Sequence, residues 1–282
     1  MAQRTTPTER QQRLGAELRK LRAAAGLSAE YAAGLLGVDR SRLSNMEAGL
    51  RPISPERLRT LACNCDCRDE KYVDALVAMA QSGRCWWEKY RGSLPAGLLD
   101  IAEFEWHAVR MRTAHTVHIP GLLQTSDHAT TIFRVAVPPM PQHEIALRVA
   151  HRMERQQVLD GDGACGYEGI IHEAALRMQF GGRTIARAQL DHLLAMSERD
   201  NVTLRVIPFD AGEFPGAGQT VIYAEGVVTQ LDAVQVDSTH GPEFLHLDAQ
   251  LARYRSQLDG MARVSLAPEH SRDFIHAIAR QL

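Results

Sequence analysis

The side chains with the most specific chemistry in this sequence lie between residues 40 and 45. An arginine can donate two hydrogen bonds to guanine O6 and N7, and an asparagine can pair in the same two-point way with adenine N6 and N7. The segment supplies both types, two hydroxyls, and a second arginine expected nearer the DNA backbone: Arg40, Ser41, Arg42, Ser44 and Asn45. These residue types predict a surface that contacts base edges in double-stranded DNA.

Further basic side chains on either side of this segment are candidates for phosphate contacts: Arg13, Arg19, Lys20 and Arg51. Such contacts fix the position of a protein on DNA without reading its sequence. Residues 1–60 carry 11 Lys and Arg against 6 Asp and Glu, whereas the remainder carries 21 against 28. A basic first part on an acidic remainder indicates that only the first part meets a polyanion.

Base-reading side chains need a helix that fits the major groove, and residues 29–48 match the helix-turn-helix template. Ala33 is the small residue where the two helices cross, and Gly37 tolerates the positive φ that the turn requires. Ser28 and Asp39 are suitable N-caps for the two helices. The apolar residues that would wedge the helices together are Leu36, Val38, Leu43 and Met46.

The helical pattern extends on both sides of this motif. We expect a polar arm over residues 1–10 and an all-helical DNA-binding domain over residues 11–82, with Ser82-Gly83 as the boundary. The first helix would begin at Gln11 and end at a left-handed Gly26. Two more helices are expected after the motif, one opened by Ser54-Pro55 and one over residues 72–79.

Beyond residue 83, strand-like and helix-like segments alternate, which predicts an α+β domain over residues 83–282. Strands are expected at residues 109–113, 166–171, 202–207, 221–223 and 234–236. Helices are expected at residues 125–133, 143–159, 184–198, 243–258 and 271–282, with a short helix from Glu173. A domain of this size can bury a substantial core. We expect it to dimerise, to bind a partner or to sense a ligand.

The composition excludes several classes of protein. Of the 282 residues, 45% are hydrophobic and 23% are charged, which is ordinary for a globular protein. No apolar run approaches the ~18 residues that span a bilayer, and the first ten residues lack the apolar segment of an export signal. Five cysteines in such a chain are expected to be reduced thiols. We therefore expect a cytoplasmic protein that associates with the nucleoid and has no membrane contact.

Candidate metal and catalytic patterns are incomplete. Cys63, Cys65 and Cys67 are thiols that could bind zinc or respond to redox state, but their spacing is not that of a zinc knuckle. His172-Glu173 begins a metalloprotease pattern whose second histidine is replaced by Leu176. We therefore expect no cofactor, no metal and no enzyme activity, and the role of the three cysteines stays open.

Residues 14–52, LGAELRKLRAAAGLSAEYAAGLLGVDRSRLSNMEAGLRP, resemble an Xre-type, phage-repressor-like DNA-binding domain. The resemblance implies a structural salt bridge between Arg22 and Glu47 that orients the recognition helix. Two positions depart from the family pattern. Ala29 stands where a phosphate-binding glutamine is frequent, and Arg40 stands where glutamine or serine is frequent. The preferred operator therefore does not carry over.

The remainder resembles the C-terminal domain of actinobacterial WhiJ-like regulators, also called Scr-type, antitoxin-like regulators. Four segments carry this likeness: HIPGLLQT at 118–125, HRMERQQVL at 151–159, IIHEAAL at 170–176 and VTLRVIPF at 202–209. The resemblance implies a transcription factor with a sensing or partner domain, which often works with a small acidic partner of the BldB-like type.

Together these observations predict a homodimeric transcriptional regulator that reads a near-palindromic operator. A small partner protein or a ligand on the C-terminal domain would control its activity. The alternative is an antitoxin-like protein that sequesters a small partner and binds DNA for autoregulation. A third hypothesis, an enzyme hidden in the C-terminal domain, would require a pocket with a strongly perturbed Cys, His or Glu.

Overall fold

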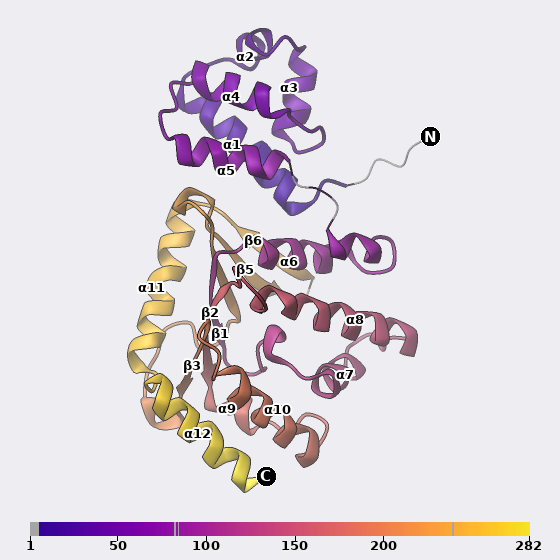
Figure 1. Cartoon of the computed structure of the whole chain (residues 1–282), viewed down its shortest axis with the longest axis vertical. Helices are drawn as coiled ribbons and strands as arrows, with labels where there is room; N and C mark the ends of the chain where they lie inside the picture. Colours follow the sequence, from indigo (N-terminus) through magenta and orange to yellow (C-terminus); the bar gives the residue numbers. More distant parts are fainter. Residues whose placement is uncertain (1–5, 82, 84, 239) are drawn as a thin grey trace. The chain divides into compact units, whose positions relative to one another are not determined.

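The computed structural model describes residues 6–81, 83, 85–238 and 240–282 (Figure 1). The chain divides into two compact units, residues 1–88 and residues 89–282, and each is described by itself. Ser82 of the expected boundary and the first five residues of the expected arm lie outside the described residues.

The N-terminal unit is all-helical, as predicted. Its helices are α1 (Glu9–Ala24), α2 (Ala29–Leu35), α3 (Arg40–Glu47), α4 (Pro55–Asn64) and α5 (Glu70–Ala80). The first helix begins two residues earlier than predicted, inside the expected arm. The reason is a capping box, in which the Thr8 hydroxyl accepts from the Gln11 amide and the Gln11 side chain accepts from the Thr8 amide. Gly26 has the predicted positive φ, at 67°.

The C-terminal unit is built on one mixed sheet of six strands. The strands are β1 (Arg110–His115), β2 (Gly166–His172), β3 (Val202–Ile207), β4 (Val221–Glu225), β5 (Ala233–Ser238) and β6 (Gly241–Leu245). Their order is β3-β2-β1-β4-β5-β6. The first three are parallel to one another, and β4, β5 and β6 continue the sheet in antiparallel fashion. The α+β class is thus confirmed.

Helices cover both faces of this sheet (Figure 1). The α-helices are α6 (Ala96–Trp106), α7 (Ser126–Arg134), α8 (Gln142–Arg155), α9 (Glu173–Arg177), α10 (Arg183–Met196), α11 (Asp248–Val264) and α12 (Pro268–Gln281). Short 3-10 helices are η1 (Trp86–Tyr90), η2 (Gly121–Leu123), η3 (Gln156–Leu159), η4 (Phe209–Ala211) and η5 (Thr229–Leu231).

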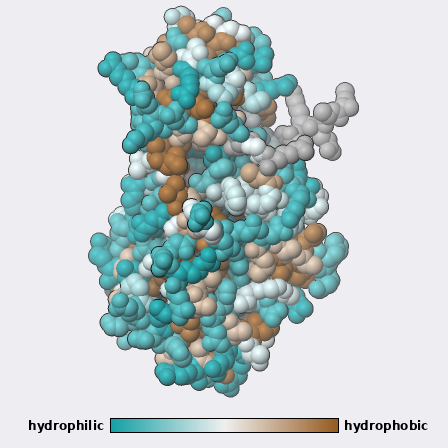
Figure 2. Space-filling model, viewed as in Figure 1, coloured by the Kyte–Doolittle hydropathy of each residue, from teal (hydrophilic) through white to brown (hydrophobic). Residues whose placement is uncertain are grey.

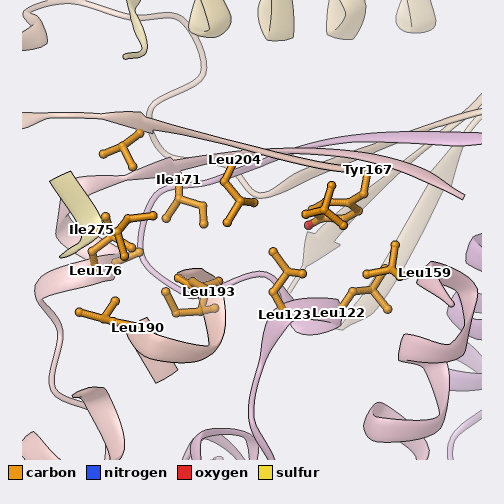
Figure 3. Packing of buried hydrophobic residues seen from close by; sticks show 14 of the residues in the cluster. Leu122, Leu123, Leu159, Tyr167, Ile171, Leu176, Leu190, Leu193, Leu204 and Ile275 are labelled. Carbon is orange, nitrogen blue, oxygen red and sulfur yellow. The ribbon is translucent and has the colours of Figure 1, made fainter. Parts of the chain in front are cut away.

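Two hydrophobic clusters, one on each face, hold the sheet between its helices. On one face, Ile171 and Leu204 of the sheet pack with Leu190 and Leu193 of α10 and with η2 (Figure 3). On the other face, α11 covers β4 and β5 through Leu251, Leu258 and Met261. Because side chains alternate along a strand, neighbouring residues of β1 and β2 serve opposite clusters.

Two elements differ from the sequence expectations. Residues 96–106 form α6, which was not predicted, because its apolar side chains are spread around the helix and give only a weak 3.6-residue period. The expected helix over residues 243–258 is wrong in its first part: residues up to Leu245 form β6, and the helix begins at Asp248. Pairing with β5, from Ser238↔Gly241 to Val234↔Leu245, overrides the local helical pattern.

On the face that Figure 2 shows, hydrophilic side chains predominate, and hydrophobic side chains form small scattered groups. Among the described residues, no helix is both long and apolar enough to cross a bilayer.

Candidate nucleic-acid interface

The turn between α2 and α3 has the geometry that the template requires. Gly37 adopts a φ of +62°, and a non-glycine residue there would be strained. Ala33 is buried at the helix crossing, and Leu43 and Met46 of α3 are buried beneath it, whereas Val38 is half-buried. Asp39 caps α3, since its Oδ1 accepts from the Arg42 amide at 2.7 Å. One face of α3 is therefore fixed against the unit, and the other is free for a ligand.

The predicted base-reading residues lie on that free face. Arg40, Ser41, Arg42 and Ser44 are exposed, and Asn45 is half-buried. A hollow of about 410 Å³ opens beside them. It is lined by Asp39, Ser41, Arg42, Asn45, Arg51 and Pro52. The fold thus brings Arg51, from the loop after α3, next to three of the predicted DNA-contacting residues, Ser41, Arg42 and Asn45.

A bidentate ion pair anchors the far end of α3. Arg22 Nε donates to Glu47 Oε1 at 2.5 Å, and Arg22 Nη2 donates to Glu47 Oε2 at 2.9 Å. The remaining nitrogen, Nη1, donates to the Leu27 carbonyl at 2.9 Å. The hydrogen bond to Glu47 raises the pKa of Arg22, although burial acts against it. This is the structural salt bridge that the resemblance implied, and its burial keeps water from competing for it.

Two glycines let the backbones of α1 and α3 touch, a feature that the sequence interpretation missed. A Cβ on Gly15 would lie 2.6 Å from the Glu47 carbonyl oxygen, and one on Gly49 would lie 2.7 Å from the Gln11 carbonyl oxygen. Gly49 also has a positive φ of 73°. The available signal was a glycine within the first predicted helix, Gly15, and another two residues after α3, Gly49.

The predicted phosphate contacts fall into two groups. Arg19, Lys20 and Arg51 have exposed side chains, and Arg19 also approaches Glu47 at 3.4 Å. Arg13 is a correction: its side chain is only 10% exposed and pairs with Glu17 at 2.9 Å. Tyr72 donates a hydrogen bond to the same buried carboxylate. Arg13 therefore belongs to an internal network of the unit and presents little side chain for a phosphate contact.

An exposed aromatic residue on α2 was also missed. Tyr31 is 60% exposed although it is a large side chain, and its amide is capped by Ser28 at 3.1 Å. In helix-turn-helix units the first helix of the motif crosses the DNA backbone. The Tyr31 hydroxyl is thus a candidate phosphate contact, and the available signal was a single aromatic residue in the first helix of the motif.

The cysteines form no metal centre in the part of the chain that the structure describes, where no group of three His, Cys, Asp or Glu side chains could hold an ion. Cys63 is exposed, and Cys65 and Cys67 are half-buried. Burial raises the pKa of Cys65, and the neighbouring Cys67 adds to this effect. In the C-terminal unit, burial raises the pKa of Cys165 to about 12. Both shifts favour the protonated thiol over the reactive thiolate.

Comparison with known families assigns both parts of the chain. Residues 13–72 match a helix-turn-helix domain, so the N-terminal unit is of the kind that binds DNA. Comparison with curated proteins and with solved structures found no match. Residues 98–277 match a family described as a domain of unknown function, DUF5753. Since this match covers more than half of the sequence, the chain belongs to the DUF5753 family, and it carries a helix-turn-helix domain in front of the family's domain.

Proposed function

We propose that this chain is a sequence-specific transcriptional regulator of the Xre type. The observation that carries the proposal is the contrast between the two faces of α3. One face is locked by Leu43, Met46 and the Arg22–Glu47 pair. The other presents Arg40 and its neighbours to solvent beside an open hollow. A helix held in this way can enter the major groove without rearranging.

Each exposed side chain has a separate role in this proposal. Arg40 and Asn45 contact base edges, where a bidentate pair is worth about 1–3 kcal/mol of discrimination. Ser41 and Ser44 add hydroxyl contacts. Arg42, Arg51, Arg19 and Lys20 neutralise phosphates, and Asp39 at the rim of the hollow rejects phosphates that approach in the wrong register.

The second part of the proposal concerns regulation. One helix-turn-helix unit contacts a single half-site, so a homodimer on a near-palindromic operator is the arrangement that gives useful affinity. The C-terminal unit supplies the regulatory input through a ligand or a small partner protein. Its resemblance to WhiJ-like regulators, which often work with a BldB-like partner, supports the partner form of this input.

Arg40→Ala tests the proposal directly. The full chain is first used to select duplexes from a random pool, and the affinity of wild type and variant is then measured at fixed salt for the selected and a scrambled duplex. We expect Arg40→Ala to lose about 10-fold to 100-fold of the preference for the selected duplex, because one bidentate contact is removed. Circular dichroism should show the wild-type helix content.

Arg68→Ala is the matched control, since Arg68 is an exposed arginine of the same unit that lies between α4 and α5 and pairs with Asp66. It should bind both duplexes as the wild type does. An Arg40→Ala protein that is folded and keeps the full preference would contradict the assignment of α3 as the reading helix.

A further inference from the structure

A cluster of polar side chains lies where β1 and β5 end. The register Ala114↔Val221 and Val221↔Val236 places the next residues, His115 and Asp237, at the same edge of the sheet. Alternation along each strand puts both on the face that α7 and α8 cover, opposite Ala114 and Val236. Ligands of sheets with parallel strands characteristically bind outside the carboxyl ends of those strands.

Two histidines of this cluster are buried without hydrogen-bond partners. His128 of α7 is 2% exposed, and neither of its ring nitrogens has a partner among the described residues. His115 is also buried, and its Nε2 has none either. A neutral imidazole always carries one N–H donor, and buried polar groups are almost always hydrogen-bonded. These nitrogens could therefore bind a ligand, since the described residues supply no partner for them.

Arg152 of α8 brings an unmatched positive charge to the same place. Its Nη1 donates to Gln124 Oε1 at 2.6 Å, and its Cζ lies 4.4 Å from the centroid of the Phe133 ring. Its Nε is buried and unpartnered, and it makes no ion pair with any carboxylate of the described residues. Burial lowers the pKa of Arg152 to about 9, and Arg155 adds to this effect. The charges of Glu105 and Asp237 act in the opposite direction, but neither carboxylate pairs directly with this guanidinium. An anion that paired with it would reduce the cost of its burial.

A glycine lies next to the Nε edge of this guanidinium. A Cβ placed on Gly121 would lie 3.8 Å from Arg152 Nε and 3.7 Å from Nη2 of Arg155. A side chain at this position would therefore be in van der Waals contact with the Nε edge. In a guanidinium, Nε and Nη2 of the same arginine can together donate to the two oxygens of one carboxylate.

Aromatic rings flank the cluster, and its outer end is exposed. The Phe180 ring centroid lies 5.2 Å from that of His118 and 5.8 Å from that of His128. The Phe133 ring lies against the Arg152 guanidinium. His118 and Asp237 are exposed, whereas His128 is buried, so the polar groups run from the surface inward.

The charge of the cluster selects a monoanion. Burial lowers the pKa of His128 to about 4, with His118 and Arg152 contributing, so the ring is neutral near pH 7. His118 and His115 are shifted in the same direction. Arg152 is then the one cation without a carboxylate partner in this described cluster, and Asp237 at the rim opposes a second negative charge on a ligand.

We propose that this cluster binds a small aromatic monocarboxylate, whose carboxylate lies on the Nε edge of Arg152 and accepts from His128, and whose ring packs between Phe133 and Phe180. The inference rests on the proposed regulatory role of the C-terminal unit and names the chemistry of its ligand. The site needs no metal and forms no covalent bond with its occupant.

The test uses the full chain and 4-fluorobenzoate, followed by ¹⁹F NMR without DNA. We expect saturable binding of 4-fluorobenzoate and none of 4-fluorobenzamide, which has the same shape without the charge. Arg152→Gln should weaken binding at least 10-fold, because a charge-assisted pair is lost. Gly121→Ala should weaken it as well by filling the Nε edge, although all donors remain.

Arg148→Gln is the matched control, since Arg148 lies one turn earlier on α8 and pairs with Glu144 at 2.6 Å; it should bind as the wild type does. Equal binding of the amide, no saturable binding, or unchanged affinity in a folded Arg152→Gln protein would overturn the proposal. Displacement by equimolar inorganic phosphate would overturn the ligand class. These outcomes are independent of the Arg40→Ala result, which tests the DNA-binding function alone.

Discussion

Arg22 in the N-terminal unit and Arg152 in the C-terminal unit are both arginines with little exposed surface, but their surroundings differ. All three nitrogen atoms of Arg22 donate to groups of its own unit, two of them to Glu47. Arg152 has one protein acceptor, Gln124, and a buried Nε without any among the described residues. The difference separates an arginine that holds a fold together from one that is kept ready for a ligand.

The same contrast recurs within α8. Arg155, which lies one helical turn after Arg152, donates to both oxygens of Glu105 at 2.7 and 2.6 Å. A completed pair of this kind contributes specificity of structure, and removing one partner leaves a buried charge. The two arginines therefore predict opposite responses to mutation, and the following experiments rank those responses from the largest to the smallest.

Glu105→Gln should have the largest effect. It leaves Arg155, whose side chain is 6% exposed, without its counter-charge, which costs about 3–5 kcal/mol of unfolding free energy. Urea unfolding followed by circular dichroism measures this cost. Glu198→Gln removes an exposed pair with Arg272 and should cost under about 1 kcal/mol. Equal costs for the two variants would show that burial of the pair is irrelevant.

Glu47→Gln should cost somewhat less, about 3 kcal/mol, because Arg22 keeps 16% of its side chain exposed and can be partly hydrated. The loss should appear in the transition of the N-terminal unit. Asp74→Asn, which breaks an exposed pair with Arg59, is the control and should be nearly neutral. A neutral Glu47→Gln would mean that packing alone positions α3.

The buried histidines predict a pH dependence of the C-terminal unit. Because the pKa of His128 is lowered to about 4 from an unfolded value near 6.5, only the unfolded chain takes up this proton between these values. Stability is then fully present above about pH 6.5 and is lost as the pH falls toward 4, by about 2 kcal/mol at pH 5. Urea midpoints at pH 7 and pH 5 measure it. His128→Gln should remove this share of the dependence, whereas His115, whose pKa burial lowers to about 3, keeps its own share. An unchanged slope would place the titration elsewhere.

Arg152→Gln should have the smallest effect on the free energy of unfolding, and this effect should be stabilising where the others are destabilising. Removing an unpaired buried cation relieves a desolvation cost, which offsets the packing that is lost. We expect an unfolding free energy between unchanged and about 1 kcal/mol higher. Thermal melting without added carboxylate measures it. A loss as large as that of Glu105→Gln would make Arg152 a structural residue and erase the contrast between the two arginines.

The motif of the N-terminal unit could be predicted in detail because its signals are local. Ser28, Asp39 and Ser54 each cap the helix that follows immediately, and each was identified from its position alone. Gly37 adopts the positive φ that its place in the turn required. Arg13 pairs with Glu17 on the same helix, but the burial of this pair depends on a distant residue: only the packing of α1 against α5 places the Tyr72 hydroxyl on the Glu17 carboxylate.

The C-terminal unit was predictable in class but not in its polar cluster. Most strands and helices were found because their apolar periodicity is local. The cluster joins His115, His128 and Arg152 from β1, α7 and α8, and no spacing in the sequence relates them. Likewise β6 was read as helix, since its strand character comes from β5 and not from residues 241–245 themselves.

The glycine contact between α1 and α3 determines how DNA binding can be switched. With Gly15 against the Glu47 backbone and Gly49 against the Gln11 backbone, no side chain that could repack lies between the two backbones at these contacts. A sliding or tilting recognition helix would need backbone atoms to pass through one another. Any signal must therefore act on the whole N-terminal unit as a rigid body. It can change the position of this unit or the fraction of time for which the unit is available to DNA, while the DNA-contacting surface itself stays constant.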